Sequence, residues 1–237
     1  MSDTAVTQSA PTPTPAPLAT RDYRDPAGLT RWLKGLLIAS FVVDLAAAGS
    51  GIMELVFLQS LSNGTAAGDI NVLADANDTR QQAIGVAQFA LYLVTAVVFL
   101  TWIYRANRNA RALGARDMRF TPAWAVGWYF VPIMSLWRPF QAMREIWQAS
   151  EQPGNWQSVS TPPLLGWWWT LYLGAQILAQ IGFQLSKDID SVGDAMTAST
   201  LITISDFVSM PLDIVAILLV TQIAAKQVWQ AKTVEVF

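Results

Sequence analysis

Four stretches of the 237-residue chain are long, strongly apolar and almost free of charge: residues 35–58, 82–104, 165–185 and 201–225. As an α-helix, each is about 30 Å long or more at ~1.5 Å per residue, which matches the hydrocarbon core of a bilayer. In lipid every backbone polar group needs an internal partner, and a helix satisfies this within one segment. We therefore expect an all-α, polytopic membrane protein with four transmembrane helices.

Basic and tryptophan residues indicate which side of the membrane each loop occupies. With four spans, Arg80 and Lys187 are the only two of the 15 Lys and Arg residues on the outer side. All 11 tryptophans fall on the opposite side or at the adjoining helix ends. Short cytoplasmic loops are rich in Lys and Arg, and indole rings favour the membrane interface. The pattern predicts a multi-pass protein of the inner (plasma) membrane with both termini cytoplasmic.

Composition excludes several classes of site. The chain contains no cysteine and no histidine, so disulfides, thiolate–zinc sites and Ser–His or Cys–His catalytic pairs are excluded. The net charge of −2 and the placement of the basic residues give no indication of nucleic-acid binding. We expect no catalytic residues, no metal and no cofactor, and thus a protein that is not an enzyme.

The chain divides into a tail, one membrane domain and a short end. Residues 1–30 alternate Pro with Thr and Ala and predict a disordered cytoplasmic tail. Residues 31–230 form the single membrane domain, and residues 231–237 form a second short cytoplasmic tail.

The segment at residues 120–150, between the second and third spans, is the least regular part of this domain. Residues 120–137 are uncharged, but Pro122 and Pro132 interrupt a helix and arginine-rich sequence flanks both ends. We predict an amphipathic or re-entrant cytoplasmic segment rather than a fifth span, although a crossing stays open. A short helix is predicted from Pro139 to about Ser150, packed on the floor of the bundle.

A long ordered run from Val98 to Ser150 carries a family resemblance. It includes "WAVGW" at 124–128 and "LWRPFQAMREIWQAS" at 136–150, and "LLGWWWTLYL" follows at 164–173. These motifs resemble the bacterial membrane family called domain of unknown function 4328, over most of residues 25–230. The resemblance implies a bacterial inner-membrane protein with several spans. It supplies no activity and no catalytic residues.

Polar side chains inside the spans are the first candidate site. The predicted intramembrane polar network consists of Asp44, Thr95, Gln176, Gln180 and Asp213. All of these except Gln180 are expected near the bilayer midplane, and Gln180 continues a polar stripe along the third span from Gln176. Glu54 and Asp206 are expected nearer the outer interface. No Lys or Arg lies within the spans, so these carboxyl groups must be protonated, hydrogen-bonded or partnered by a cation. Two interpretations stay open: a network that fixes helix packing, or a proton- or cation-coupled pathway.

The cytoplasmic face is the second candidate site. A lipid- or partner-binding face is predicted from Arg105, Arg108, Arg111, Trp124, Trp128, Trp137, Arg138, Arg144 and Trp147. Each basic residue near the surface of an anionic membrane contributes about 1 kcal/mol of attraction. The leading interpretation is therefore a non-enzymatic membrane protein that engages anionic lipid headgroups, a protein partner or a second copy through this face. The alternative is a small transporter or channel-like protein that uses the intramembrane aspartates.

Overall fold

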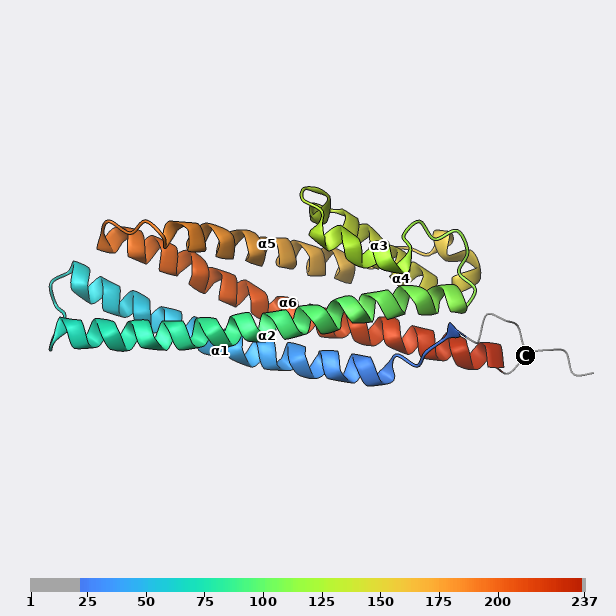
Figure 1. Cartoon of the computed structure of the whole chain (residues 1–237), viewed down its shortest axis with the longest axis horizontal. Helices are drawn as coiled ribbons and strands as arrows, with labels where there is room; N and C mark the ends of the chain where they lie inside the picture. Colours follow the sequence, from blue (N-terminus) through green and yellow to red (C-terminus); the bar gives the residue numbers. More distant parts are fainter. Residues whose placement is uncertain (1–21, 236–237) are drawn as a thin grey trace, which may run out of the picture.

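The computed structural model describes residues 22–235, and every regular element in that range is a helix (Figure 1). Most of the predicted tail, residues 1–21, and the final two residues lie outside the described residues. Four long helices run side by side, and a layer of short helices covers one end of the bundle. An all-α fold is thus confirmed for this part of the chain.

The first pair of helices is an antiparallel hairpin formed by α1 (Ala27–Ser62) and α2 (Ile70–Ala112). Asp69 caps α2 by accepting a 3.0 Å hydrogen bond from the Asn71 backbone N–H. The sequence predicts a polar loop over residues 63–81, and this is wrong for residues 70–81, which are helical. Polar side chains of this helical segment, such as Asn77 and Gln81, donate hydrogen bonds to Glu54 of α1.

The second pair consists of α5 (Pro163–Leu185) and α6 (Val192–Glu235). Pro163 occupies the first turn of α5, where its missing N–H leaves no helical bond unmade. Pro211 lies inside α6, whose helix continues on both sides of it.

α6 is the central helix of the bundle, because it packs along both α1 and α5, whereas α2 packs mainly on α1. Two glycines allow the close approach. A Cβ atom at Gly51 would collide with the side chain of Thr203, and one at Gly182 would lie 2.8 Å from Cγ1 of Ile202. Small residues at such positions let helix backbones approach closely in membranes.

Three of the described helices, α1, α2 and α6, are long and apolar enough to cross a membrane. The fourth, α5, has 23 residues, about 35 Å at the helical rise, which is also sufficient length. It contains a tryptophan run at residues 167–169 and three glutamines, and it is not among the helices that meet the combined criterion of length and composition. Three of the four predicted spans therefore meet the criterion of length and composition.

Short helices between α2 and α5 form the covering layer. They are α3 (Pro122–Gly127), the 3-10 turns η2 (Trp128–Phe130) and η3 (Met134–Leu136), α4 (Arg138–Glu151) and η4 (Pro153–Ser158). The predicted helix at residues 139–150 is confirmed. It packs against α2 and α6, and its Ile146 side chain is fully buried with Trp102 and Leu219.

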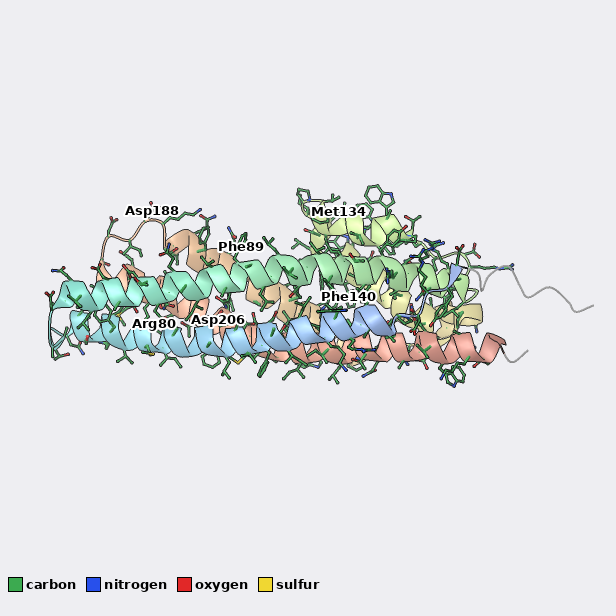
Figure 2. The ribbon with its side chains drawn as sticks, turned by 60° about the horizontal axis from the view of Figure 1, so that its bottom comes forward. Arg80, Phe89, Met134, Phe140, Asp188 and Asp206 are labelled. Carbon is green, nitrogen blue, oxygen red and sulfur yellow. The ribbon has the colours of Figure 1, made fainter. Side chains whose placement is uncertain are left out.

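The layer and the chain ends share one end of the molecule. Residue 22 and the end of α6 lie there, with α3 and α4 nearby, while the connections at residues 63–69 and 186–191 lie at the far end (Figure 1). Met134 stands in the covering layer, whereas Asp188 lies in the connection at the opposite end (Figure 2). The two ends of the described chain therefore lie at the same end of the bundle (Figure 1).

Candidate functional site

The loop between α2 and α3 forms part of the candidate site, and the buried carboxylate of Glu145 fixes this loop in position. Glu145 of α4 accepts hydrogen bonds from the backbone N–H groups of Arg119 (2.5 Å) and Phe120 (3.0 Å). Asn107 and Arg111 of α2 donate to the Phe120 carbonyl. Burial raises the pKa of the Glu145 carboxyl, and the two backbone bonds and the nearby Arg111 and Arg119 charges partly oppose that rise. The loop is thus tied to both α2 and α4.

A pocket of about 260 Å³ opens beside this loop. Its lining residues, defined here as the basic aromatic pocket, are Arg119, Phe120, Thr121, Trp124, Trp128 and Arg138. The Trp124 and Trp128 rings pack with centroids 4.8 Å apart, and the Arg138 guanidinium lies 5.3 Å from the Trp128 ring centroid. A cation over an indole face is held by the ring quadrupole.

Two hydrogen-bond donors at this pocket have no partner within the described part of the chain. The Nε of Arg138 and the Nε1 of Trp128 are buried atoms without a hydrogen-bond partner. Arg138 makes one long side-chain bond, 3.4 Å to Gln141, and neither Arg119 nor Arg138 forms an ion pair among residues 22–235. Buried donors without partners are costly, so this arrangement favours an acceptor that carries negative charge.

A second basic pocket of about 240 Å³ lies at the same end of α2. It is lined by Arg24, Thr101, Tyr104, Arg105, Arg108 and Asn109. Arg108 is engaged there, since its guanidinium lies 2.9 Å from the Asp22 carboxylate. In the basic aromatic pocket, by contrast, neither arginine forms an ion pair within the described chain, although Arg119 lies near the Glu145 carboxyl.

The structure separates the residues predicted for the lipid- or partner-binding face. Trp124, Trp128 and Arg138 meet in the basic aromatic pocket, and Arg105 and Arg108 line the second pocket. Trp137 and Arg144 are exposed outside both. The other two predicted residues have structural contacts instead: Arg111 bonds to backbone carbonyls of the loop, and Trp147 is buried in the core.

The predicted intramembrane polar network is brought together only in part. Asp44 of α1 accepts a 3.1 Å bond from Gln88 of α2. Gln176 of α5 lies 3.4 Å from the Tyr92 hydroxyl rather than against the aspartates, and Gln180 is exposed. The Oγ1 of Thr95 and the Oδ2 of Asp213 are buried without a partner among the described residues.

Asp206 and Gln88 are two members of this network that sequence reasoning missed or misplaced. Asp206 is expected near the outer interface, yet Gln88 bonds to it at 2.9 Å and to Asp44 from the same nitrogen, so the two acids lie at one level. The expectation that Asp206 lies further out than Asp44 is wrong, because counting residues along each helix separately does not show how α1 and α6 align with each other. Gln88 is a polar residue within a mostly apolar predicted span, and this feature of the sequence could have identified it as a member of the network.

Comparison with known proteins identifies a family and no closer relative. The model of the family described as "Domain of unknown function (DUF4328)" matches residues 65–225. No curated protein and no solved structure matches the chain. The matched range contains α2, the whole covering layer, α5 and most of α6, and hence all of the basic aromatic pocket.

Proposed function

We propose a function for this chain, which belongs to the DUF4328 family, a domain of unknown function. The proposal is that it is a non-enzymatic four-span membrane protein that binds an anionic phospholipid headgroup in the basic aromatic pocket. The observation that carries this proposal is the pair of guanidinium groups, Arg119 and Arg138, which form no ion pair in the described chain and lie next to an indole N–H that has no hydrogen-bond partner there. A phosphodiester offers the charge and the acceptor oxygens that these donors lack.

The position of the pocket supports a lipid rather than a soluble anion. We propose that α5 crosses the membrane beside α6, along which it packs, and completes four spans with both ends cytoplasmic. The segment at residues 128–136 then lies in the inner interface. Its side chains Phe130, Ile133 and Leu136 are apolar and exposed in the described chain, which suits contact with acyl chains. The headgroup level thereby coincides with the pocket.

Charge magnitude sets the expected selectivity. Two basic residues near the membrane surface contribute about 1 kcal/mol each toward an anionic lipid. Their sum of about 2 kcal/mol corresponds to roughly a 30-fold preference over a zwitterionic lipid of the same chain length.

The test uses the full chain, purified and delipidated in detergent, and native mass spectrometry to count bound phosphatidylglycerol against phosphatidylcholine. The test variant carries Arg119→Gln and Arg138→Gln together. The matched control is Arg116→Gln, an exposed arginine in the same loop that does not line the pocket. We expect the double variant to lose most of the preference and the control to keep it.

Three outcomes contradict the proposal. The first is an equal loss of preference in the control, because the effect is then general surface charge. The second is an unchanged preference in the double variant. The third is competition by millimolar inorganic phosphate as effective as lipid, because the pocket is then a site for a soluble anion.

A further inference from the structure

A second polar site lies on the seam where α1, α2 and α6 meet, far from the basic aromatic pocket. Gln88 of α2 lies between two acids there, and its Nε2 donates to Asp44 of α1 at 3.1 Å and to Asp206 of α6 at 2.9 Å. One amide nitrogen carries two hydrogens, so this bridge uses its full donor capacity. Each carboxyl group still has a second oxygen for which no bond to Gln88 is available.

Asp213 adds a third carboxyl group to the seam. It lies seven residues after Asp206 on the same face of α6, and its side chain is only 7% exposed. Its Oδ2 is buried and has no hydrogen-bond partner within residues 22–235. Asp44 is close enough to interact electrostatically with both Asp206 and Asp213. An unpartnered carboxyl oxygen in an apolar interior lacks the stabilisation that an ionised group needs.

No basic side chain faces these three acids within the described chain. Towards the connection at residues 63–69, α1 carries Glu54 and α2 carries Arg80, whereas the basic residues Arg31, Lys34, Arg105, Arg108 and Arg111 lie near the other ends of these two helices. On the neighbouring edge, Tyr92 of α2 and Tyr172 of α5 approach each other. Arg80 is engaged elsewhere, with Ser50 at 2.9 Å and with Asn77 at 2.5 Å. The negative charge of the seam is thus left without a compensating cation from the described protein.

A separate hydrogen-bonded group lies on the same three helices, between the seam and the connection at residues 63–69. Glu54 accepts bonds from Gln81 (2.5 Å) and from Ser199 (2.8 Å), and Asn77 lies 3.5 Å from it. Ser199, Asp206 and Asp213 are spaced by seven residues on α6, about 10 Å per step. Polar side chains therefore recur along one face of α6 from the outer end to the middle of the bundle.

We propose that Asp44, Asp206 and Asp213 form an intramembrane proton-binding site, in which a proton bound to one of the three carboxyl groups lowers the uncompensated negative charge of the seam. The residues 22–235 contain no group of three acid, His or Cys side chains arranged to hold a metal ion, so a proton is the ligand that the geometry favours over a divalent cation. Binding forms one O–H bond on a carboxylate oxygen and consumes one proton from solution, with no other change in bonding. Gln88 holds two of the acids in place by its amide hydrogens.

The experiment is an infrared pH titration of the full chain reconstituted into phosphatidylcholine vesicles. The readout is the C=O stretching band of a protonated carboxyl group, confirmed by its shift in heavy water. We expect this band at pH 7 in the natural sequence and expect it to weaken in the isosteric variants Asp213→Asn and Asp206→Asn. The matched control is Asp188→Asn, an exposed acid in the outer connection, which should leave the band unchanged.

A further variant keeps the test decisive if an aspartate variant does not fold. Gln88→Leu removes the donor shared by Asp44 and Asp206 and leaves every carboxyl group in the chain. We expect it to shift the frequency of the band, because the hydrogen bonding of two acids changes. The proposal is overturned if the natural sequence has no such band at pH 7, or if the band is unaffected by the aspartate variants and by Gln88→Leu.

Discussion

Replacing Gln227 by leucine should measurably destabilise the end of the bundle that holds the basic aromatic pocket. The Gln227 side chain is fully buried where α2, α4 and α6 meet. Its Nε2 donates to the Ala106 carbonyl at 2.8 Å and to the Ser150 hydroxyl at 2.9 Å. Its Oε1 accepts a 3.1 Å bond from Asn109, which itself bonds to the backbone of Arg24. One side chain thus joins three helices and the segment that precedes α1.

The structure gives the size of the effect. Three lost hydrogen bonds cost about 1 kcal/mol each, and the added apolar burial of leucine returns roughly 1 kcal/mol. Asn109 keeps its bonds to Arg24, and Ser150 still donates to the Ile146 carbonyl at 2.7 Å, so neither is left wholly without a partner. The expected loss in the free energy of unfolding of Gln227→Leu is therefore about 2 kcal/mol. At roughly 2–4 °C per kcal/mol, the midpoint should fall by about 4–8 °C.

Thermal unfolding in detergent, followed by tryptophan fluorescence, measures this loss. The matched control is Gln222→Leu, the same change on the same helix at an exposed position. We expect the control to unfold within about 1 °C of the natural sequence, because its amide makes no bond that the change removes. Equal midpoints for the two variants would refute the reasoning, since burial and hydrogen bonding would then contribute nothing at Gln227.

Three other changes test the packing and the loop that positions the pocket. Gly51→Ala should destabilise the α1–α6 contact by about 1–3 kcal/mol, whereas Gly49→Ala, which meets open space, should be neutral or slightly stabilising in thermal unfolding. Gly182→Ala should likewise destabilise the α5–α6 contact, with Gly174→Ala as its control. Equal stability of these two variants would contradict the close approach of α5 and α6 at Gly182. Burial raises the pKa of Glu145, so its favourable contribution to stability is complete below the ordinary value of 4.5 and is lost as pH rises through the folded-state pKa. Glu145→Gln should therefore gain stability relative to the natural sequence as pH rises over that window, and a constant difference in unfolding midpoint across the titration would argue against it.

The sequence predicts the long helices well, because hydrocarbon length and composition leave few alternatives for stretches such as 35–58 and 201–225. It also predicts the α4 helix, since Pro139 suits a first turn and the apolar spacing is helical. It misses the helical start of α2 at Ile70. The polar residues there suggest a loop, and their partner, Glu54 on α1, is known only once the two helices are paired.

The sites are harder to predict for the same reason. Residue type alone places Arg111 and Trp147 on a binding face, but tertiary contacts turn Arg111 toward loop carbonyls and bury Trp147 in the core. Arg119 lies in the arginine-rich segment after α2, but the sequence does not show that it lines a pocket, because the pocket combines residues of the loop, α3, η2 and α4. Helical periodicity relates residues on one helix, and it gives no relative height for Asp44 and Asp206 on different helices.

The side of the membrane reached at each end of α5 tests the proposed four-span arrangement most directly. The chain contains no cysteine, so single cysteines at Ser160, before α5, and at Asp188, after it, report without background. Labelling of intact cells with a membrane-impermeant maleimide should modify the cysteine of Asp188→Cys and not that of Ser160→Cys, which should react only after the membrane is opened. Equal reactivity of the two positions in intact cells would mean that α5 does not cross, and the lipid-facing position of the basic aromatic pocket would have to be abandoned.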